Sequence, residues 1–112
     1  MAKKKKAFFE GELYTKLSVN QLILFSIYSI TLNKKNCTFE ELVERCFISF
    51  PETFRFENIK KWPDSRKLDR PLRTLRSKRL IGSDLEDNIA LTNLGRKSAK
   101  QIAKNLTQKK LF

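Results

Sequence analysis

Residues 60–79 read KKWPDSRKLDRPLRTLRSKR and carry nine Lys or Arg but only two acidic residues. In a helix, which turns by about 100° per residue, Leu68, Leu72 and Leu75 share one face. The opposite face carries the polar and basic residues Arg66, Arg70, Arg73 and Ser77. The spacing therefore predicts an amphipathic helix whose apolar face packs on a core while its basic face is free to meet a polyanion.

Local signals indicate where this helix begins and ends. Pro63 and Asp64 are typical of a helix start, and the helix is expected to end near Lys78. Pro71 lies inside this range, where it removes a backbone donor and clashes with the preceding turn. We therefore expect a kink at Pro71, or a helix broken into two pieces there.

The charge of the whole chain favours the same kind of partner. Its 112 residues, enough for one domain, include 24 Lys or Arg and 12 Asp or Glu, for a formal net charge of +12. Residues 80–95 hold three acids and no base, whereas residues 96–112 hold six bases and no acid. The fold is thus expected to present separate positive regions, which favours a polyanionic partner.

Residues 1–17 are expected to form a basic, partly apolar N-terminal tail, and residues 18–112 the domain. The run Lys3–Lys6 suits phosphate binding, docking on an anionic membrane, nuclear targeting or simple solubilisation. No signal-peptide pattern follows this run, and the longest apolar stretch, residues 22–32, is too short to cross a bilayer. We therefore expect a soluble cytoplasmic protein, associated with the nucleoid and not with a membrane.

Two capping signals predict the first two helices. Ser18 with Gln21 opens a helix that reaches about Leu32, and Thr38 with Glu41 opens a second one. The first of these helices is apolar nearly all round. It is therefore expected to be either the central helix of the fold or a helix whose far side contacts another chain.

Residues 47–63 show no sustained period and predict an ordered, irregular connector after a second helix that ends near Cys46. The connector is rich in aromatic residues, namely Phe47, Phe50, Phe54, Phe56 and Trp62. Together with nearby basic residues they suit stacking on bases, as in single-strand binders. Core packing is the favoured interpretation, because a domain of this size needs large apolar side chains.

The last third of the chain predicts a hairpin and a final helix. Leu80–Ile81 and Ile89–Leu91 suit two short strands around a turn-rich tip. Thr92 is positioned to cap a helix whose apolar face comprises Ala99, Ile102, Ala103 and Leu106. The fold class is therefore expected to be mainly α with a small β-hairpin.

Enzymatic and metal chemistry find little support in the sequence. The chain has no histidine and no Cys-x-x-Cys pair, and its two cysteines, Cys37 and Cys46, are nine positions apart. No nucleophile motif occurs. The acidic group Asp84, Glu86 and Asp87 is typical of an exposed turn. We expect no enzymatic activity, no cofactor, no metal site and no small-molecule pocket.

The order of elements, with a basic third helix followed by a hairpin and a last helix, resembles the winged helix-turn-helix domain. Two local patterns carry the resemblance, Leu72-x-x-Leu75-x-x-x-x-Leu80-Ile81 and Leu91-Thr92-x-x-Gly95-Arg96-x-x-Ala99. The first looks like a recognition helix passing into the first wing strand. The second is similar to the passage from wing to final helix in MarR-like and PadR-like regulators. The resemblance covers about residues 18–106 and implies a three-helix core, a wing and a C-terminal helix.

In that family the third helix enters the major groove of duplex DNA. The resemblance therefore implies DNA-binding roles for Lys61, Arg66, Lys67, Arg70, Arg73, Thr74, Ser77 and Lys78. Arg70 and Arg73 are assigned to bases, because arginine reads guanine through two hydrogen bonds. The lysines of this set, Lys61, Lys67 and Lys78, are assigned to phosphates.

The chain departs from the family pattern in three places. The connector before the third helix is longer than the usual turn of roughly three to four residues. Arg79 stands where the family commonly has a glycine in left-handed conformation. The acidic wing tip, residues 84–87, would repel phosphate.

We therefore expect duplex DNA binding, sequence-specific or general, by a small transcriptional regulator or a DNA-holding subunit that forms a homodimer or joins a larger protein partner. Two alternatives stay open. One is a protein-interaction adaptor that docks on a larger assembly through the apolar first helix and the Phe8, Phe9 tail. The other is a binder of RNA or single strands that uses the aromatic connector.

Overall fold

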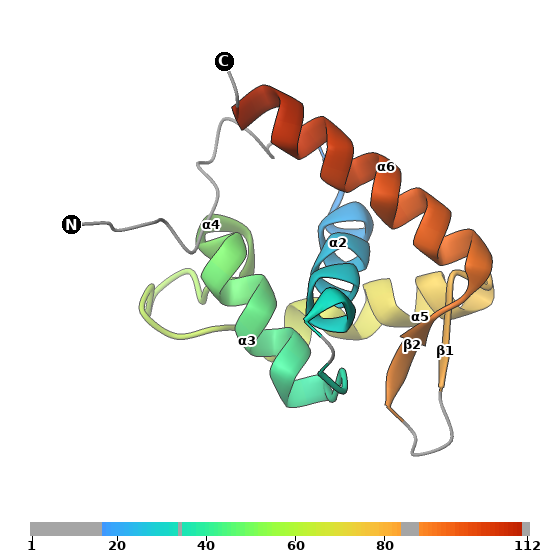
Figure 1. The fold of residues 1–112 in the computed structure, drawn as a ribbon. Helices are drawn as coiled ribbons and strands as arrows, with labels where there is room; N and C mark the ends of the chain where they lie inside the picture. The colour runs from blue at the N-terminus through green and yellow to red at the C-terminus, as the bar shows by residue number, and fades with distance from the viewer. Residues whose placement is uncertain (1–16, 34, 84–87, 111–112) are drawn as a thin grey trace.

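The computed structural model describes residues 17–33, 35–83 and 88–110, with side chains described as far as residue 106 (Figure 1). The expected tail before Leu17 and the acidic segment 84–87 lie outside the described residues. The elements in chain order are α2 (Val19–Leu32), α3 (Phe39–Ser49), α4 (Pro51–Phe54), the 3-10 helix η1 (Ser65–Leu68), α5 (Asp69–Ser77), β1 (Ile81–Ser83), β2 (Ile89–Leu91) and α6 (Asn93–Lys110). The expected fold class, mainly α with a small β-hairpin, is confirmed.

Helix α2 is the central element of the fold. The expected capping box is present, because the Ser18 hydroxyl accepts a hydrogen bond from the Gln21 amide at 3.2 Å and the Gln21 side chain accepts one from the Ser18 amide at 2.9 Å. The helix packs against α3, α5, α6 and β2 (Figure 1). Its buried side chains cover more than half of its circumference and comprise Leu22, Ile23, Leu24, Ser26, Ile27 and Ile30. Phe25 and Tyr28, on the remaining side, are partly buried against the core. The apolar character of this helix is thus explained by its central position within its own chain.

The segment after α2 is more helical than the sequence suggested. Thr38 caps α3 as expected, accepting from the Glu41 amide at 3.1 Å, but the helix continues to Ser49. The short helix α4 follows at once, with Pro51 in its first turn. Proline cannot continue the hydrogen bonding of α3 but is well suited to start a new helix. The expectation of an irregular connector beginning at residue 47 was therefore wrong for its first half.

Two aromatic residues of this segment belong to the core. Phe50 and Phe54 are completely buried, with exposed fractions of 0% and 1%. The Phe50 ring lies 5.9 Å from the ring of Phe25 in an edge-on arrangement. Core packing is thus confirmed for this pair, whereas Trp62 remains 54% exposed.

The expected third helix is divided into η1 and α5. Asp64 caps η1 by accepting a hydrogen bond from the Arg66 amide at 3.2 Å, and regular α-helix begins only at Asp69. Pro71 therefore falls in the first turn of α5, where backbone amides have no partner within the helix in any case. The expected division into two pieces occurs just before the proline. Leu68 and Leu75 are buried in the core, and Leu72 packs against it.

A left-handed residue ends α5. Arg79 has a φ of 61°, a left-handed conformation that glycine adopts without strain. The Arg79 amide donates to the Arg76 carbonyl and the Leu80 amide to the Leu75 carbonyl, both at 3.0 Å. This pair of bonds is the Schellman arrangement at a helix C-terminus.

The antiparallel hairpin pairs Ile81 with Leu91 and Ser83 with Ile89. The Ile89 amide also donates to the Cys37 carbonyl at 2.8 Å, so the hairpin is attached to the segment before α3. Thr92 then caps α6 as expected, accepting from the Gly95 amide at 3.0 Å. The expected apolar face of α6 is confirmed, since Ala99, Ile102 and Leu106 are buried and Ala103 is partly buried.

Candidate nucleic-acid interface

The basic side of α5 is exposed to solvent. Arg70 and Arg73 lie one turn apart on this helix, and Ser77 follows one turn later; all three are exposed. Within the described ranges, neither guanidinium takes part in a hydrogen bond or an ion pair. The described residues therefore leave the donors of both guanidiniums to a ligand.

Two other predicted residues of this helix are placed differently. Thr74 is only partly exposed, and its carbonyl accepts the Lys78 amide at 3.0 Å. Lys78 ends the helix with an exposed side chain. Arg76 is also exposed and was missed by the sequence reasoning. Its spacing of three from Arg73 is the signal that places it beside that arginine on the helix surface.

Arg66 is exposed but binds groups of its own chain, unlike Arg70 and Arg73. Its Nε lies 3.1 Å from Oδ1 of Asp64 and its Nη2 lies 3.3 Å from Oδ2. The guanidinium carbon also lies 5.4 Å from the centre of the Phe56 ring. The side chain is 76% exposed, but its donors on one edge are used by a carboxylate.

Lys67 is likewise engaged within the chain. Its Nζ donates to the Thr53 carbonyl at 3.1 Å and to the Arg55 carbonyl at 2.8 Å. These carbonyls lie at the end of α4, where a helix presents partial negative charge. The structure therefore does not bring Arg66 and Lys67 together with the arginines of α5.

Asp64 is the buried centre of these contacts. Its carboxylate meets the Arg66 side chain and backbone amide, and its own amide donates to the Phe54 carbonyl at 2.7 Å. The hydrogen bond from the Arg66 side chain lowers the pKa of the Asp64 carboxyl below its ordinary value of 3.8. The positive charges of Arg66 and Lys67 lower it further, while burial opposes them. The carboxylate is thus held in its charged form at neutral pH.

These contacts hold residues 55–63 as an ordered loop, which we call the pinned loop. Its ends meet in an antiparallel bridge between Arg55 and Pro63. Inside it, the Phe56 amide donates to the Trp62 carbonyl at 3.0 Å, and the Trp62 amide to the Ile59 carbonyl at 3.1 Å. Lys61, which was predicted to contact phosphate, lies in this loop and not on α5.

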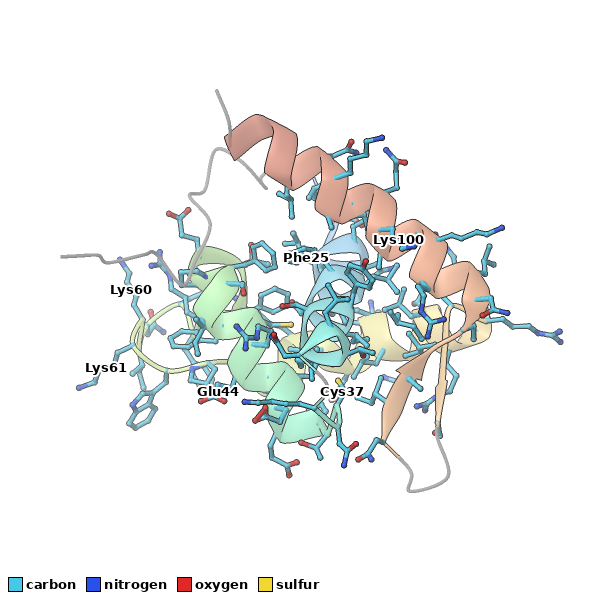
Figure 2. The ribbon with its side chains drawn as sticks, in the orientation of Figure 1. Phe25, Cys37, Glu44, Lys60, Lys61 and Lys100 are labelled. Carbon is cyan, nitrogen blue, oxygen red and sulfur yellow. The ribbon has the colours of Figure 1, made fainter. Side chains whose placement is uncertain are left out.

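Helix α6 presents a further basic surface. Its exposed side is lined by Arg96, Lys97, Lys100 and Lys104. In Figure 2 Lys100 extends from α6, whereas Lys60 and Lys61 extend from the pinned loop at the other side of the view. Separate positive regions were expected from the charge distribution, although no α6 residue was among the predicted site residues.

Described residues also line hollows on the surface, two of which follow, although no pocket was expected from the sequence. One, of about 630 Å³, is a mainly apolar groove along α3, lined by Phe39, Glu40, Val43, Glu44, Phe47, Ile48, Pro63 and Ser65. The other, of about 350 Å³, lies beside the pinned loop and is lined by residues 56–59 with Asp64, Arg66 and Lys67. Their linings combine segments that are apart in the sequence, which is why no local pattern indicated them.

The two cysteines are structural. Both are buried, and burial raises the pKa of each thiol to about 12. A thiol with such a pKa is protonated at neutral pH and is a poor nucleophile or metal ligand. Among the residues that the structure covers, no three His, Cys, Asp or Glu side chains gather in a group able to hold a metal ion.

Comparisons of the chain with protein-family models, with curated proteins and with solved structures gave no match. A separate search of the described residues found no helix with the length and apolar character needed to span a membrane.

Proposed function

We propose that this protein binds duplex DNA through the exposed side of α5, as a winged-helix domain in a small transcriptional regulator or a DNA-holding subunit. The observation that carries the proposal is the state of Arg70 and Arg73. Both are exposed and without an ion-pair partner in the described part of the chain, on a helix whose other side packs on the core through Leu72 and Leu75.

The chemistry of this surface suits DNA. A major groove of about 12 Å width admits one α-helix, and an arginine in it can donate two hydrogen bonds to guanine. Arg70 and Arg73 are the residues proposed to read bases. Lys78 and Arg76, at the end of the same helix, are proposed to contact phosphates. Lys67 is not among them, because its ammonium already binds the Thr53 and Arg55 carbonyls.

The order of elements supports the same proposal. A central α2, the helix α3, the basic helix α5, the β1–β2 hairpin and the closing helix α6 follow the order of the winged-helix domain. The left-handed turn between α5 and β1 is present as well, with arginine in place of glycine. Homodimer formation and a nucleoid location remain expectations that accompany this proposal.

A protein-interaction adaptor is the second candidate, and the groove along α3 is the observation that favours it. Its apolar lining and its two glutamates suit a partner peptide with apolar and basic residues. An adaptor has no need for unpaired arginines on α5, so the two functions make different demands on that helix.

The test is a titration of the full chain with fluorescently labelled duplexes of random sequence at several salt concentrations. About five phosphate contacts would give a slope of log affinity against log salt of roughly −4 to −5. Replacing both arginines, R70A with R73A, is expected to weaken binding without lowering the midpoint of thermal unfolding much. The matched control is K100A with K104A on α6, which removes the same charge. A flat salt response would favour the adaptor. An equal loss of affinity in the control would mean that DNA is held by non-specific attraction between charges.

A further inference from the structure

We infer that the pinned loop, residues 55–63, is a second nucleic-acid contact that stacks an unpaired base on Trp62 and holds the neighbouring phosphates with Lys60 and Lys61. This inference goes beyond the proposed duplex contact of α5. It concerns a different surface, a different ligand form and a different chemistry, so each can fail without the other.

The exposure of Trp62 is the first observation. The largest side chain type in proteins stays 54% exposed here, and Ile59 beside it is 41% exposed. Phe50 and Phe54, from the same aromatic segment, are fully buried in the core. Phe50 and Phe54 thus supply the aromatic packing of the core, whereas the indole of Trp62 lies outside the core.

The order of the loop is the second observation. The Arg55–Pro63 bridge closes it, and the Phe56 and Trp62 amides are both satisfied inside it. The Asp64–Arg66 ion pair and the stacking of Arg66 on Phe56 hold one side of the loop. The indole is thus carried by a backbone that is already ordered, which reduces the entropy lost when a ligand binds.

Charge selects the ligand. Lys60 and Lys61 are exposed next to Trp62, and both extend outward from the loop in Figure 2. Glu57 is the acid that opposes them within the loop, while Asp64 is neutralised by Arg66. An aromatic ring flanked by ammonium groups suits a base together with its phosphates. An apolar partner without acidic groups would fit this positively charged loop less well than a nucleic acid would.

The position of the loop links this contact to α5. Pro63 leads directly into Asp64 and η1, and η1 into α5, so Trp62 precedes the helix that carries Arg70 and Arg73. The two proposed contacts are thus carried by consecutive segments of the chain.

The experiment uses the fact that Trp62 is the only tryptophan of the chain. Indole fluorescence then reports from this loop alone. The full chain is titrated with oligothymidine, which forms no duplex, and in parallel with a blunt hairpin duplex. Stacking is expected to quench the fluorescence strongly with the single strand and weakly with the blunt duplex.

Variants separate stacking from attraction by charge. W62A is expected to lower the affinity for labelled oligothymidine by about fivefold to a hundredfold, the range for the loss of one base–aromatic stack. W62F is expected to restore most of it. I59A, which shortens the other exposed apolar side chain of the loop, serves as the matched control and should change the affinity less than about twofold.

The outcomes distinguish the two proposals. If R70A with R73A abolishes duplex binding while oligothymidine still quenches Trp62, both contacts exist. If that double variant leaves duplex binding intact while W62A loses the single strand, the α5 proposal fails and the loop proposal stands. The loop proposal would be overturned by any of three results: oligothymidine binding without quenching, unchanged affinity in W62A, or no binding of oligothymidine at low salt.

Discussion

The Thr92 hydroxyl donates a 2.7 Å hydrogen bond to the carbonyl of Arg79, the left-handed residue that ends α5. The same hydroxyl accepts the Gly95 amide and so caps α6. One side chain therefore ties the end of the basic helix to the start of the last helix. The hydrogen bond spans the hairpin, because its two residues are 13 positions apart in the chain.

Gly95 is required at this junction because no side chain fits there. A Cβ added at Gly95 would overlap the carbonyl group of Leu80, which is backbone and cannot rotate away. We expect G95A to lower the free energy of unfolding by about 1–3 kcal/mol or more, as overpacking does. Urea denaturation of both proteins measures the change.

Gly82 provides the control for that measurement. A Cβ added there meets nothing within 4 Å, so G82A is expected to change the free energy of unfolding by less than about 0.5 kcal/mol. Equal effects of G95A and G82A would mean that the α5–α6 junction is looser than described.

Replacing Arg79 with glycine is expected to stabilise the fold. An L-residue at a φ of 61° carries a strain of about 1 kcal/mol that glycine does not have. The gain in R79G should be somewhat below that figure, because glycine also raises the entropy of the unfolded chain. Thermal and urea unfolding of R79G measure it. The contrasting variant is R76G, where glycine inside α5 should destabilise by about 1 kcal/mol; destabilisation by R79G would contradict the assigned conformation.

Asp64 is expected to make the protein sensitive to acid. Its pKa is lowered in the folded state by the hydrogen bond from Arg66, so its charged form stabilises the fold above the ordinary value of 3.8. This contribution is lost as the pH falls through the lowered folded-state pKa. In D64N, the drop in free energy of unfolding between neutral pH and this acidic range should be smaller than in the native protein. Urea denaturation at a series of pH values measures it.

Asp69 is the matched control for the acid experiment. It is an exposed carboxylate in the first turn of α5, and no ion pair involves it in the described part of the chain. D69N should keep the acid sensitivity of the native protein. If D64N shows the full native sensitivity, the Asp64–Arg66 pair does not contribute as described.

Thiol reactivity provides an independent check of the core. Because burial raises the pKa of Cys37 and Cys46 to about 12, a thiol reagent at pH 8 should modify the folded protein slowly and the denatured protein fast. Introducing a cysteine at the exposed Ser83 should add one rapidly reacting thiol. Rapid modification of the native protein would show that α2 and α3 do not pack as described.

Several local features were predicted correctly because the signals that produce them are local. The Ser18–Gln21 capping box, the Thr38 cap and the Thr92 cap each join residues three positions apart. The helical spacing of apolar residues on α5 and α6 likewise indicates which face of each helix is buried. A sequence states such relations directly.

The candidate site was predicted only in part. Which basic residues are exposed and which are engaged within the chain depends on contacts between residues far apart in the sequence. The exposure of Arg70 and Arg73 could be predicted, because the apolar residues of the same helix lie on the opposite face. The engagement of Lys67 could not, since its partner carbonyls lie 14 and 12 positions earlier in the chain. Arg66 similarly meets the Phe56 ring across the pinned loop.

The sequence by itself determined where α2, α3 and α6 are capped and which helix faces are apolar, because these properties depend on neighbours within one turn. Only the tertiary structure decided which of the basic residues stay free. Folding brings the carbonyls of α4 and the carboxylate of Asp64 beside Lys67 and Arg66, and a cation satisfied inside its own chain has less to offer a ligand.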